Sequence, residues 1–196
     1  LEGDPDQIAI ISIGENISPK TLTFKELNHR VSSVQKGLSK LGVKKGTIVA
    51  GFVPNCAETV ISMLAVSSLG GVWTSCSPDF GANGVVDRFG QVNPHILITS
   101  NGYSYNGKLF KLEEKVNGVL ESIDSIRHIV EIEYVDIKSN FNHDSIISFG
   151  DILNNNQTQP TFEQLPFDHP LFIMYSSGTT GPPKSIVHSA GGTLLQ

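Results

Sequence analysis

The sequence predicts an α/β protein in which a layered, mostly parallel sheet is flanked by helices. Short continuous apolar runs, typical of strands that are covered on both faces, alternate along the chain with segments of helical periodicity. Strands that are separated by helices usually pair in parallel, because each helix returns the chain to the same edge of the sheet. The 196 residues, of which 39% are hydrophobic, are enough for the core of one domain of ordinary size.

Composition excludes several other classes of protein. The hydrophobic share is too high for a disordered chain, and no apolar run is long enough to span a membrane. Lys and Arg total 14 against 19 Asp and Glu, so the net charge is −5, and without a basic block we expect no nucleic-acid partner. The charged fraction of 17% is below the roughly 25% usual for soluble domains. Part of the surface is therefore expected to pack against a partner or against further parts of a larger domain.

The cysteines and the first residues bear on the compartment. Cys56 and Cys76 lie far apart and fit no CxxC or CxxH pattern, which predicts free buried thiols in a reducing compartment such as the cytosol, and no metal site. Residues 1–6 have neither the pattern of a signal peptide nor an initiator Met. We therefore expect the natural N-terminus to lie elsewhere.

The first helix is expected directly after Thr23. Residues 23–26 (Thr-Phe-Lys-Glu) form a capping box, in which the Thr23 hydroxyl and the Glu26 carboxylate bind free amides of the first turn. Apolar residues then recur at steps of four and three, which predicts one apolar helix face: Leu27, Val31, Val34, Leu38 and Leu41. Gly42 predicts a left-handed cap at the end of this helix.

The following elements alternate between strand and helix. A continuous apolar run predicts a buried strand at residues 47–53, which Pro54-Asn55 ends. The next elements expected are a helix at 57–69, a strand at 72–75, a turn-rich loop at 78–84, a helix at 85–92, a strand at 95–100, a helix at 108–123 and a strand at 128–135. Residues 138–169 are polar and rich in Asn and Gln, which predicts a long surface connection with one short helical piece near residues 149–153. Residues 171–175 then predict a buried strand.

The loop after this last strand carries the strongest functional pattern. In parallel sheets, ligands bind beyond the carboxyl ends of strands, which is where this loop lies. Its two glycines let backbone amides approach an anion, its four hydroxyls can donate to phosphate oxygens, and its lysine supplies a positive charge. The residues that we expect to contact phosphate are Ser176, Ser177, Gly178, Thr179, Thr180, Gly181 and Lys184. The loop is not a Walker A motif, because Pro183 stands where that motif has Gly before its Lys; a surface turn without ligand is the alternative.

Residues 176–184 resemble the signature phosphate loop of the adenylate-forming superfamily, which includes acyl-CoA synthetases, firefly luciferase and peptide-synthetase adenylation domains. The family pattern Ser/Thr-Ser-Gly-Thr-Thr-Gly-x-Pro-Lys is matched throughout. More narrowly, residues 72–81, 105–108 and 186–194 resemble the corresponding segments of acetoacetyl-CoA synthetases. Acetyl-CoA synthetases are similar after the loop but differ around residues 73–81.

The resemblance implies an AMP-forming acid–thiol ligase. In such enzymes a carboxylate attacks the α-phosphate of ATP, which gives an acyl-adenylate and pyrophosphate, and the thiol of CoA then displaces AMP. The implied substrates are acetoacetate, ATP with Mg²⁺, and CoA. The loop would hold the β- and γ-phosphates, with Thr179 and Lys184 as the catalytic residues. An acetyl- or propionyl-CoA synthetase and a non-catalytic nucleotide-binding module stay open as alternatives.

The resemblance also concerns the extent of the chain. In the family, the adenine- and ribose-binding motifs, a hinge and a C-terminal lid domain follow the phosphate loop, whereas twelve residues follow Lys184 here. We therefore expect residues 1–196 to be part of an N-terminal AMP-binding domain. It would pack against the remainder of its own chain and would be inactive alone.

Five other residues are weaker candidates. His188 suits either a site role or a structural hydrogen bond. Core packing is the simpler interpretation of Trp73 and Cys76. Asp79 precedes Phe-Gly as in protein kinases, but nothing else in the sequence is kinase-like. The resemblance suggests a contact of Lys108 with the 3′-phosphate of CoA, because related synthetases use this neighbourhood for it, although a solvated lysine is the simpler interpretation. The other histidines share no metal-ligand spacing: His29, His95, His128, His143 and His169.

Overall fold

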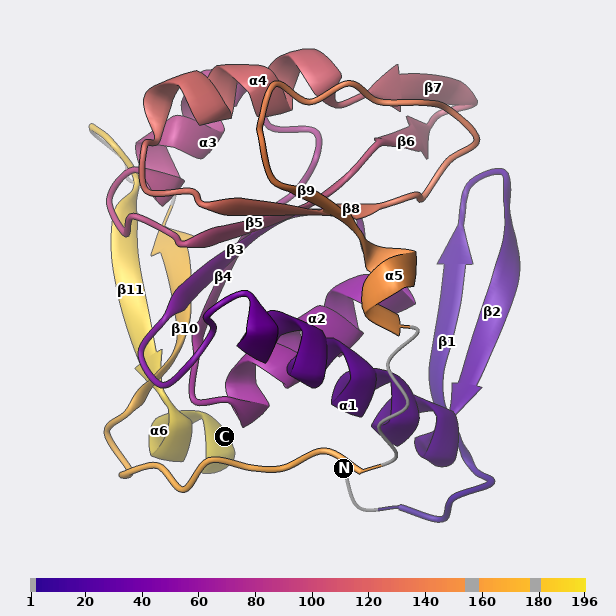
Figure 1. The fold of residues 1–196 in the computed structure, drawn as a ribbon, viewed down its shortest axis with the longest axis vertical. Coiled ribbons are helices and arrows are strands. Elements are labelled where there is room, and N and C mark those ends of the chain that lie inside the picture. Colours follow the sequence, from indigo (N-terminus) through magenta and orange to yellow (C-terminus); the bar gives the residue numbers. More distant parts are fainter. Residues whose placement is uncertain (1–2, 154–158, 177–180) are drawn as a thin grey trace.

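The computed structural model describes residues 3–153, 159–176 and 181–196. Within these ranges, a seven-stranded sheet in the order β11-β10-β4-β3-β5-β8-β9 forms the centre of the molecule (Figure 1). Neighbouring strands are parallel, apart from the antiparallel pair of β10 and β11. The strands are β3 (Ile48–Phe52), β4 (Val72–Cys76), β5 (Ile96–Ser100), β8 (His128–Ile132), β9 (Ile146–Ser148), β10 (Pro170–Ser176) and β11 (Lys184–Ser189). The predicted fold class is confirmed.

Helices cover both faces of the sheet and form the outer layers seen in Figure 1. One face carries α1 (Phe24–Lys40), α2 (Ala57–Ser68) and α5 (Phe149–Leu153), and the other carries α3 (Ala82–Phe89) and α4 (Glu113–Ser122). Two antiparallel hairpins stand beside the sheet: β1 (Ile8–Gly14) with β2 (Ile17–Thr23), and β6 (Gly102–Tyr105) with β7 (Lys108–Lys111). The short helix α6 (Ala190–Leu194) follows β11.

Helix α1 begins and ends as its sequence predicts. The Thr23 amide donates to the Glu26 carboxylate at 2.8 Å, and the Glu26 amide donates back to the Thr23 hydroxyl at 3.2 Å. The hydrogen bond that the Thr23 backbone amide donates also lowers the pKa of the Glu26 carboxyl group. At the other end, Gly42 has a φ of +88°, a conformation in which a side chain would be strained. Local rules alone therefore set both ends of this helix.

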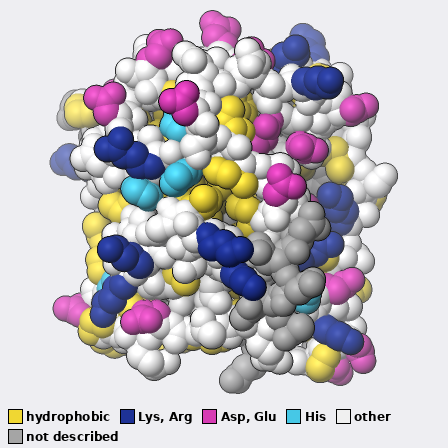
Figure 2. Space-filling model, viewed as in Figure 1, with side chains coloured by type: hydrophobic (Ala, Val, Ile, Leu, Met, Phe, Trp, Pro, Cys, Tyr) yellow, Lys and Arg dark blue, Asp and Glu magenta, His cyan; other side chains and the backbone are white. Residues whose placement is uncertain are grey.

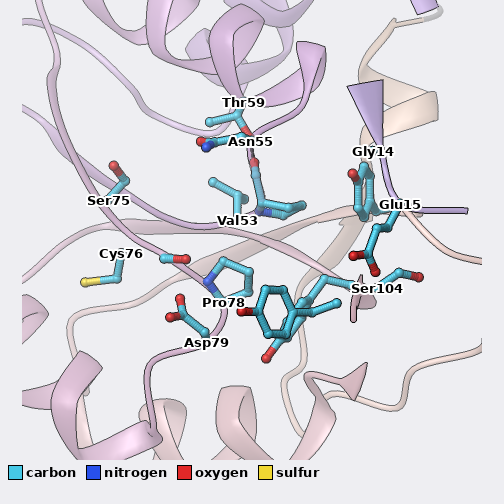
Figure 3. A pocket seen from close by; sticks show the side chains of 15 residues that line it. Gly14, Glu15, Val53, Asn55, Thr59, Ser75, Cys76, Pro78, Asp79 and Ser104 are labelled. Atoms are coloured by element: carbon cyan, nitrogen blue, oxygen red, sulfur yellow. Dashed lines mark hydrogen bonds between the residues drawn. The ribbon is translucent and has the colours of Figure 1, made fainter. Parts of the chain in front are cut away.

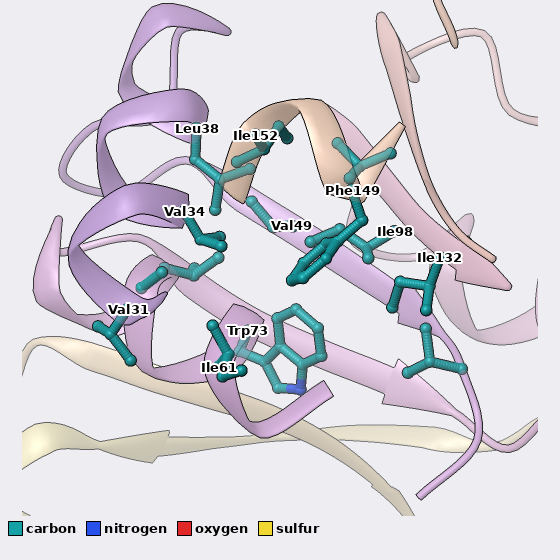
Figure 4. Packing of buried hydrophobic residues seen from close by; sticks show 14 of the residues in the cluster. Val31, Val34, Leu38, Val49, Ile61, Trp73, Ile98, Ile132, Phe149 and Ile152 are labelled. Carbon is teal, nitrogen blue, oxygen red and sulfur yellow. The ribbon is translucent and has the colours of Figure 1, made fainter. Parts of the chain in front are cut away.

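The larger apolar cluster lies between the sheet and the helices α1, α2 and α5 (Figure 4). Trp73 of β4 is buried in it, as predicted, and its ring lies against the neighbouring strand β3 at Gly51. A Cβ added to Gly51 would lie 2.5 Å from the indole, so only glycine leaves room for this ring. The two cysteines are free and buried, which confirms the prediction of unpaired buried thiols.

The helix expected at residues 108–123 is wrong in its first part. Lys108–Lys111 form strand β7, and α4 begins at Glu113. Asn106 and Gly107 both have positive φ, at 51° and 71°, and make the tight turn between β6 and β7. Asn-Gly is the preferred pair for such two-residue hairpins, and this turn outweighed the helical periodicity of the residues that follow.

Three further expectations differ from the structure. Helix α3 starts at Ala82, three residues before the expected start. The segment expected to be a surface connection contributes the edge strand β9, because apolar residues interrupt its polar sequence. The short helical piece expected near residues 149–153 is confirmed as α5, which buries Phe149 and Ile152. Strand β10 is only partly buried: Ile173 is covered, but Met174 is 58% exposed. The helices lie over the central strands and leave the outer pair of β10 and β11 partly uncovered.

Candidate functional site

The carboxyl ends of the parallel strands lie at one edge of the sheet, and β10 ends there at Ser176, the residue before the undescribed part of the predicted phosphate loop. At this edge, two pockets of the described part lie on either side of the end of β4, and residues 75–77 line both of them. We call them the hairpin pocket and the arginine pocket. The loop between β10 and β11 follows strand residues that line the second of them.

The hairpin pocket has a volume of about 570 Å³ (Figure 3). Asn55 and Thr59 lie on one side of it, Pro78 and Asp79 lie on the opposite side, and Glu15 enters from the β1–β2 hairpin. Its lining residues are Gly14, Glu15, Val53, Pro54, Asn55, Thr59, Ser75, Cys76, Ser77, Pro78, Asp79, Tyr103, Ser104, Tyr105 and Tyr134. The mixture of aromatic, hydroxyl and carboxylate groups suits a polar organic ligand.

Hydrogen bonds shape the wall of the hairpin pocket. The Gly107 amide donates to the Glu15 carboxylate at 3.1 Å, which joins the turns of the two hairpins. The Lys115 ammonium group donates to the Pro78 carbonyl at 2.8 Å and lies 5.7 Å from the centre of the Tyr103 ring. Burial raises the pKa of Tyr103, with a smaller contribution from the charge of Asp79, and burial lowers the pKa of Lys115.

The arginine pocket has a volume of about 480 Å³ and mainly apolar and aromatic walls. Its lining residues are Met63, Trp73, Ser75, Cys76, Ser77, Phe80, Arg88, Phe172, Ile173, Met174 and Tyr175. The Arg88 guanidinium lies 4.4 Å from the centre of the Phe80 ring and 6.0 Å from that of Tyr175, and its Nη1 donates to the Gly84 carbonyl at 2.7 Å. A fixed cation among apolar walls suits a small organic anion.

The two ends of the phosphate loop are adjacent. Ser176, the last residue of β10, pairs with Lys184, the first residue of β11. Gly181 has a φ of +101°, a conformation that favours glycine. Lys184 is exposed, so its side chain is free to reach a ligand beyond the edge of the sheet. The other predicted phosphate contacts lie outside the described residues: Ser177, Gly178, Thr179 and Thr180.

Neighbouring elements hold both ends of this loop through side-chain hydrogen bonds. Before the loop, the Thr74 hydroxyl donates to the Ile173 carbonyl at 2.9 Å and shares a 3.0 Å hydrogen bond with the Tyr175 hydroxyl. Burial raises the pKa of Tyr175. After the loop, Gln91 contacts the residues on either side of Lys184. Sequence reasoning missed these residues, because their partners lie about a hundred positions away and no local motif marks them.

The weaker candidates separate into core and edge positions. Trp73 and Cys76 are buried in the core and also line the arginine pocket. Burial raises the pKa of the Cys76 thiol to about 12, so this thiol is neutral at ordinary pH. Asp79 lines the hairpin pocket. Lys108 is exposed on β7, and His188 is half-buried on β11.

Other histidines have structural surroundings. His169 is buried, and its Nε2 lies 2.9 Å from the Gly70 carbonyl. His95 and His128 meet edge to face, with 6.0 Å between their ring centres. Burial lowers the pKa of His128, and the charges of His95 and His143 lower it further. Across residues 3–153, 159–176 and 181–196, His, Cys, Asp and Glu side chains form no group of three or more that could hold a metal ion.

The surface adds two findings. Acidic and basic side chains are interspersed over the face shown in Figure 2. Among the helices of the described part, none combines the length and the apolar character needed to cross a membrane.

Comparisons of sequence and of structure with known proteins find similarity to the same group of enzymes. The AMP-binding enzyme family matches the chain over residues 1–196. The chain is 42% identical to an acetoacetyl-CoA synthetase of Xenopus tropicalis, over 97% of this chain and 30% of that protein. It is 45% identical to an acetoacetyl-coenzyme A synthetase of Rhizobium meliloti (strain 1021), over 96% of this chain and 29% of that protein. The solved structure of an acetoacetyl-CoA synthetase from Streptomyces lividans is similar with a TM-score of 0.91 and 40% identity, over 97% of this chain and 29% of that one. The chain thus spans about three tenths of the length of these relatives.

Proposed function

The chain belongs to the AMP-binding enzyme family, and we propose that the complete protein is an acetoacetate–CoA ligase. The observation that carries this proposal is the similarity to acetoacetyl-CoA synthetases along nearly the whole chain, in sequence and in fold. We further propose that residues 1–196 form part of the N-terminal AMP-binding domain of that protein, which packs against the rest of the same chain.

The proposed reaction has two steps. A carboxylate oxygen of acetoacetate attacks the α-phosphorus of ATP; the new bond joins that oxygen to phosphorus, and pyrophosphate leaves. The sulfur of CoA then attacks the acyl carbon, AMP leaves with the shared oxygen, and the thiol loses its proton. The products are acetoacetyl-CoA, AMP and pyrophosphate.

The phosphate loop supports the first step. Positioning and charge neutralisation contribute most when a polyphosphate is the leaving group. Lys184 stands exposed at the end of the loop, where its ammonium group suits the β- and γ-phosphates. Lys184 and Thr179 are the proposed catalytic residues. The proposed further phosphate contacts are Ser176, Ser177, Gly178, Thr180 and Gly181. Mg²⁺ would arrive bound to ATP, because this ion is usually held by substrate phosphates and water.

The thiols suggest where the enzyme works. Cys56 and Cys76 are both free and buried, and unpaired cysteines are typical of reducing compartments. This supports the cytosol as the proposed location.

An ATP–pyrophosphate exchange assay on the complete protein tests the proposal. We expect exchange with acetoacetate to be faster than with acetate or propionate. Faster exchange with acetate would replace the substrate assignment by that of an acetyl-CoA synthetase. Exchange with none of these acids, in a protein that still binds MgATP, would favour the non-catalytic nucleotide-binding module.

A further inference from the structure

Gln91 lies just beyond the end of helix α3 and reaches the exit of the phosphate loop. Its backbone amide donates to the Arg88 carbonyl at 3.2 Å, so the residue continues the last turn of the helix. Its side-chain Nε2 lies 2.6 Å from the Asp87 carbonyl of the same turn. The side-chain amide of Gln91 is therefore oriented by its own helix, independently of its contacts with the loop.

The same side chain bonds to the residues on both sides of Lys184. Nε2 donates to the Pro183 carbonyl at 2.8 Å, and Oε1 accepts a bond from the Ser185 hydroxyl at 2.8 Å. The opposite orientation of the amide would place Oε1 against the carbonyls of Pro183 and Asp87, where oxygen would face oxygen. The network thus fixes which way the amide points and joins α3 to the start of β11.

This contact fixes the backbone from which the Lys184 side chain extends. A lysine side chain is long and flexible, so the point where its backbone is held determines which volume its ammonium group samples. Gln91 does not stabilise the fold by burying apolar surface, because it is exposed and belongs to neither apolar cluster. Helix α3 also carries Arg88, which lines the arginine pocket beside Tyr175. The same helix therefore contacts both this pocket and the residues that follow the phosphate loop.

We propose that Gln91 is a positioning residue for Lys184, one that holds the lysine backbone in the geometry needed to meet the phosphates of ATP. This inference rests on the proposed function, since it assumes that Lys184 binds the polyphosphate. A group that is placed before the reaction loses less free energy on reaching the transition state. The contribution of Gln91 should therefore appear in the use of ATP and not in stability.

Steady-state kinetics of the complete protein test this role. Gln91→Met keeps the size of the side chain and removes its hydrogen bonds. We expect it to raise the KM for ATP about tenfold, or to lower kcat by that factor, because both bonds to the residues beside Lys184 are lost. The KM for the acid substrate and the melting temperature should stay unchanged. Ser185→Ala removes one of the two bonds and should give about a threefold effect.

Two further variants distinguish the positioning of Lys184 from a general effect of substitutions at the ends of α3. Gln91→Glu still accepts the Ser185 bond but places a carboxylate against the Pro183 carbonyl, so its loss should equal or exceed that of Gln91→Met. Asn83→Leu makes a matched change at an exposed position near the other end of α3 and should leave all constants unchanged.

Four outcomes of these experiments are distinguished. Unchanged ATP kinetics in a folded Gln91→Met protein would overturn the inference, and so would a parallel change in all KM values together with the melting temperature. If the unaltered protein prefers another acid, the substrate proposal fails, and the same variants are compared with that acid. If it exchanges with no acid, the comparison is made on the Kd for MgATP, and an unchanged Kd in Gln91→Met would overturn the inference.

Discussion

The central strands β3 and β5 and the outer strands β10 and β11 belong to one sheet but are held in different ways. Val49 and Phe52 of β3 are fully buried, because helices cover both faces of the sheet there (Figure 1). In the outer pair, Met174 and Val187 are each 58% exposed. The outer pair is tied to its neighbours by polar contacts, from Thr74 before the loop and from Gln91 after it.

This difference separates stability from activity. Apolar burial provides most of the free energy of folding, so the central strands should determine the stability of the protein. The outer strands carry the loop that we propose to bind ATP, and polar anchors can define its position without a large apolar surface. Substitutions in the centre should therefore change unfolding, and substitutions at the loop should change kinetics.

The largest expected effect is that of Phe52→Ala. The change removes most of a fully buried ring and leaves a cavity, which should lower the free energy of unfolding by about 3–5 kcal/mol. Urea denaturation of the unaltered and altered proteins measures the difference. Phe162→Ala is a matched control, because this ring is 54% exposed, and its cost should be below about 1 kcal/mol. Equal losses in the two variants would contradict the distinction between centre and periphery.

The next largest effect is expected at the loop. Lys184→Ala removes the exposed ammonium group, and kcat/KM for ATP should fall by about 10- to 100-fold, which corresponds to about 1.4–2.7 kcal/mol of transition-state stabilisation. The melting temperature should not change. Lys36→Ala removes an exposed lysine from α1 and serves as control. Unchanged ATP kinetics in Lys184→Ala would show that the phosphate-loop assignment is wrong.

The same contrast explains what could be predicted from the sequence. The start and end of α1 follow from rules that act over a few residues, at Thr23 and Gly42, and both were predicted. The apolar run of β3 identified a strand covered on both faces, because burial there follows directly from composition. Prediction was wrong where two local signals competed, as at the Asn106-Gly107 turn.

The site could be predicted only in part. The loop motif contains its chemistry in consecutive residues, so Ser176 and Lys184 could be identified, although their contacts with phosphate stay a prediction. The contact between Gln91 and Pro183 joins residues 92 positions apart, and no periodicity or motif marks it. The partial exposure of β10 depends on how far the helices extend over the sheet, which a strand sequence does not encode.

A smaller effect is expected at alkaline pH. Burial raises the pKa of Cys56 to about 11 and that of Cys76 to about 12, from an ordinary value of 9.0. Above pH 9 these thiols ionise in the unfolded chain while the folded protein keeps them protonated, so the unfolded state binds fewer protons and stability falls as pH rises. Urea denaturation between pH 8 and pH 10.5 should show this decline. The double variant Cys56→Ala, Cys76→Ala should show a shallower slope, and an equal slope would assign the decline to other groups.

The smallest effect is expected for Val187→Thr, which tests the outer strands directly. Thr has nearly the shape of Val and favours strands equally well, and at this exposed position its hydroxyl can bind water, so the free energy of unfolding should change by less than about 0.5 kcal/mol. Val49→Thr makes the same change in β3, where the hydroxyl would be buried among apolar side chains, and should cost about 1–3 kcal/mol. Because the chemical change is identical, the difference between the two variants measures how strongly each part of the sheet is sequestered from water. A Val187→Thr loss as large as that of Val49→Thr would mean that the outer strands are covered in the complete protein, by the rest of the chain or by a partner.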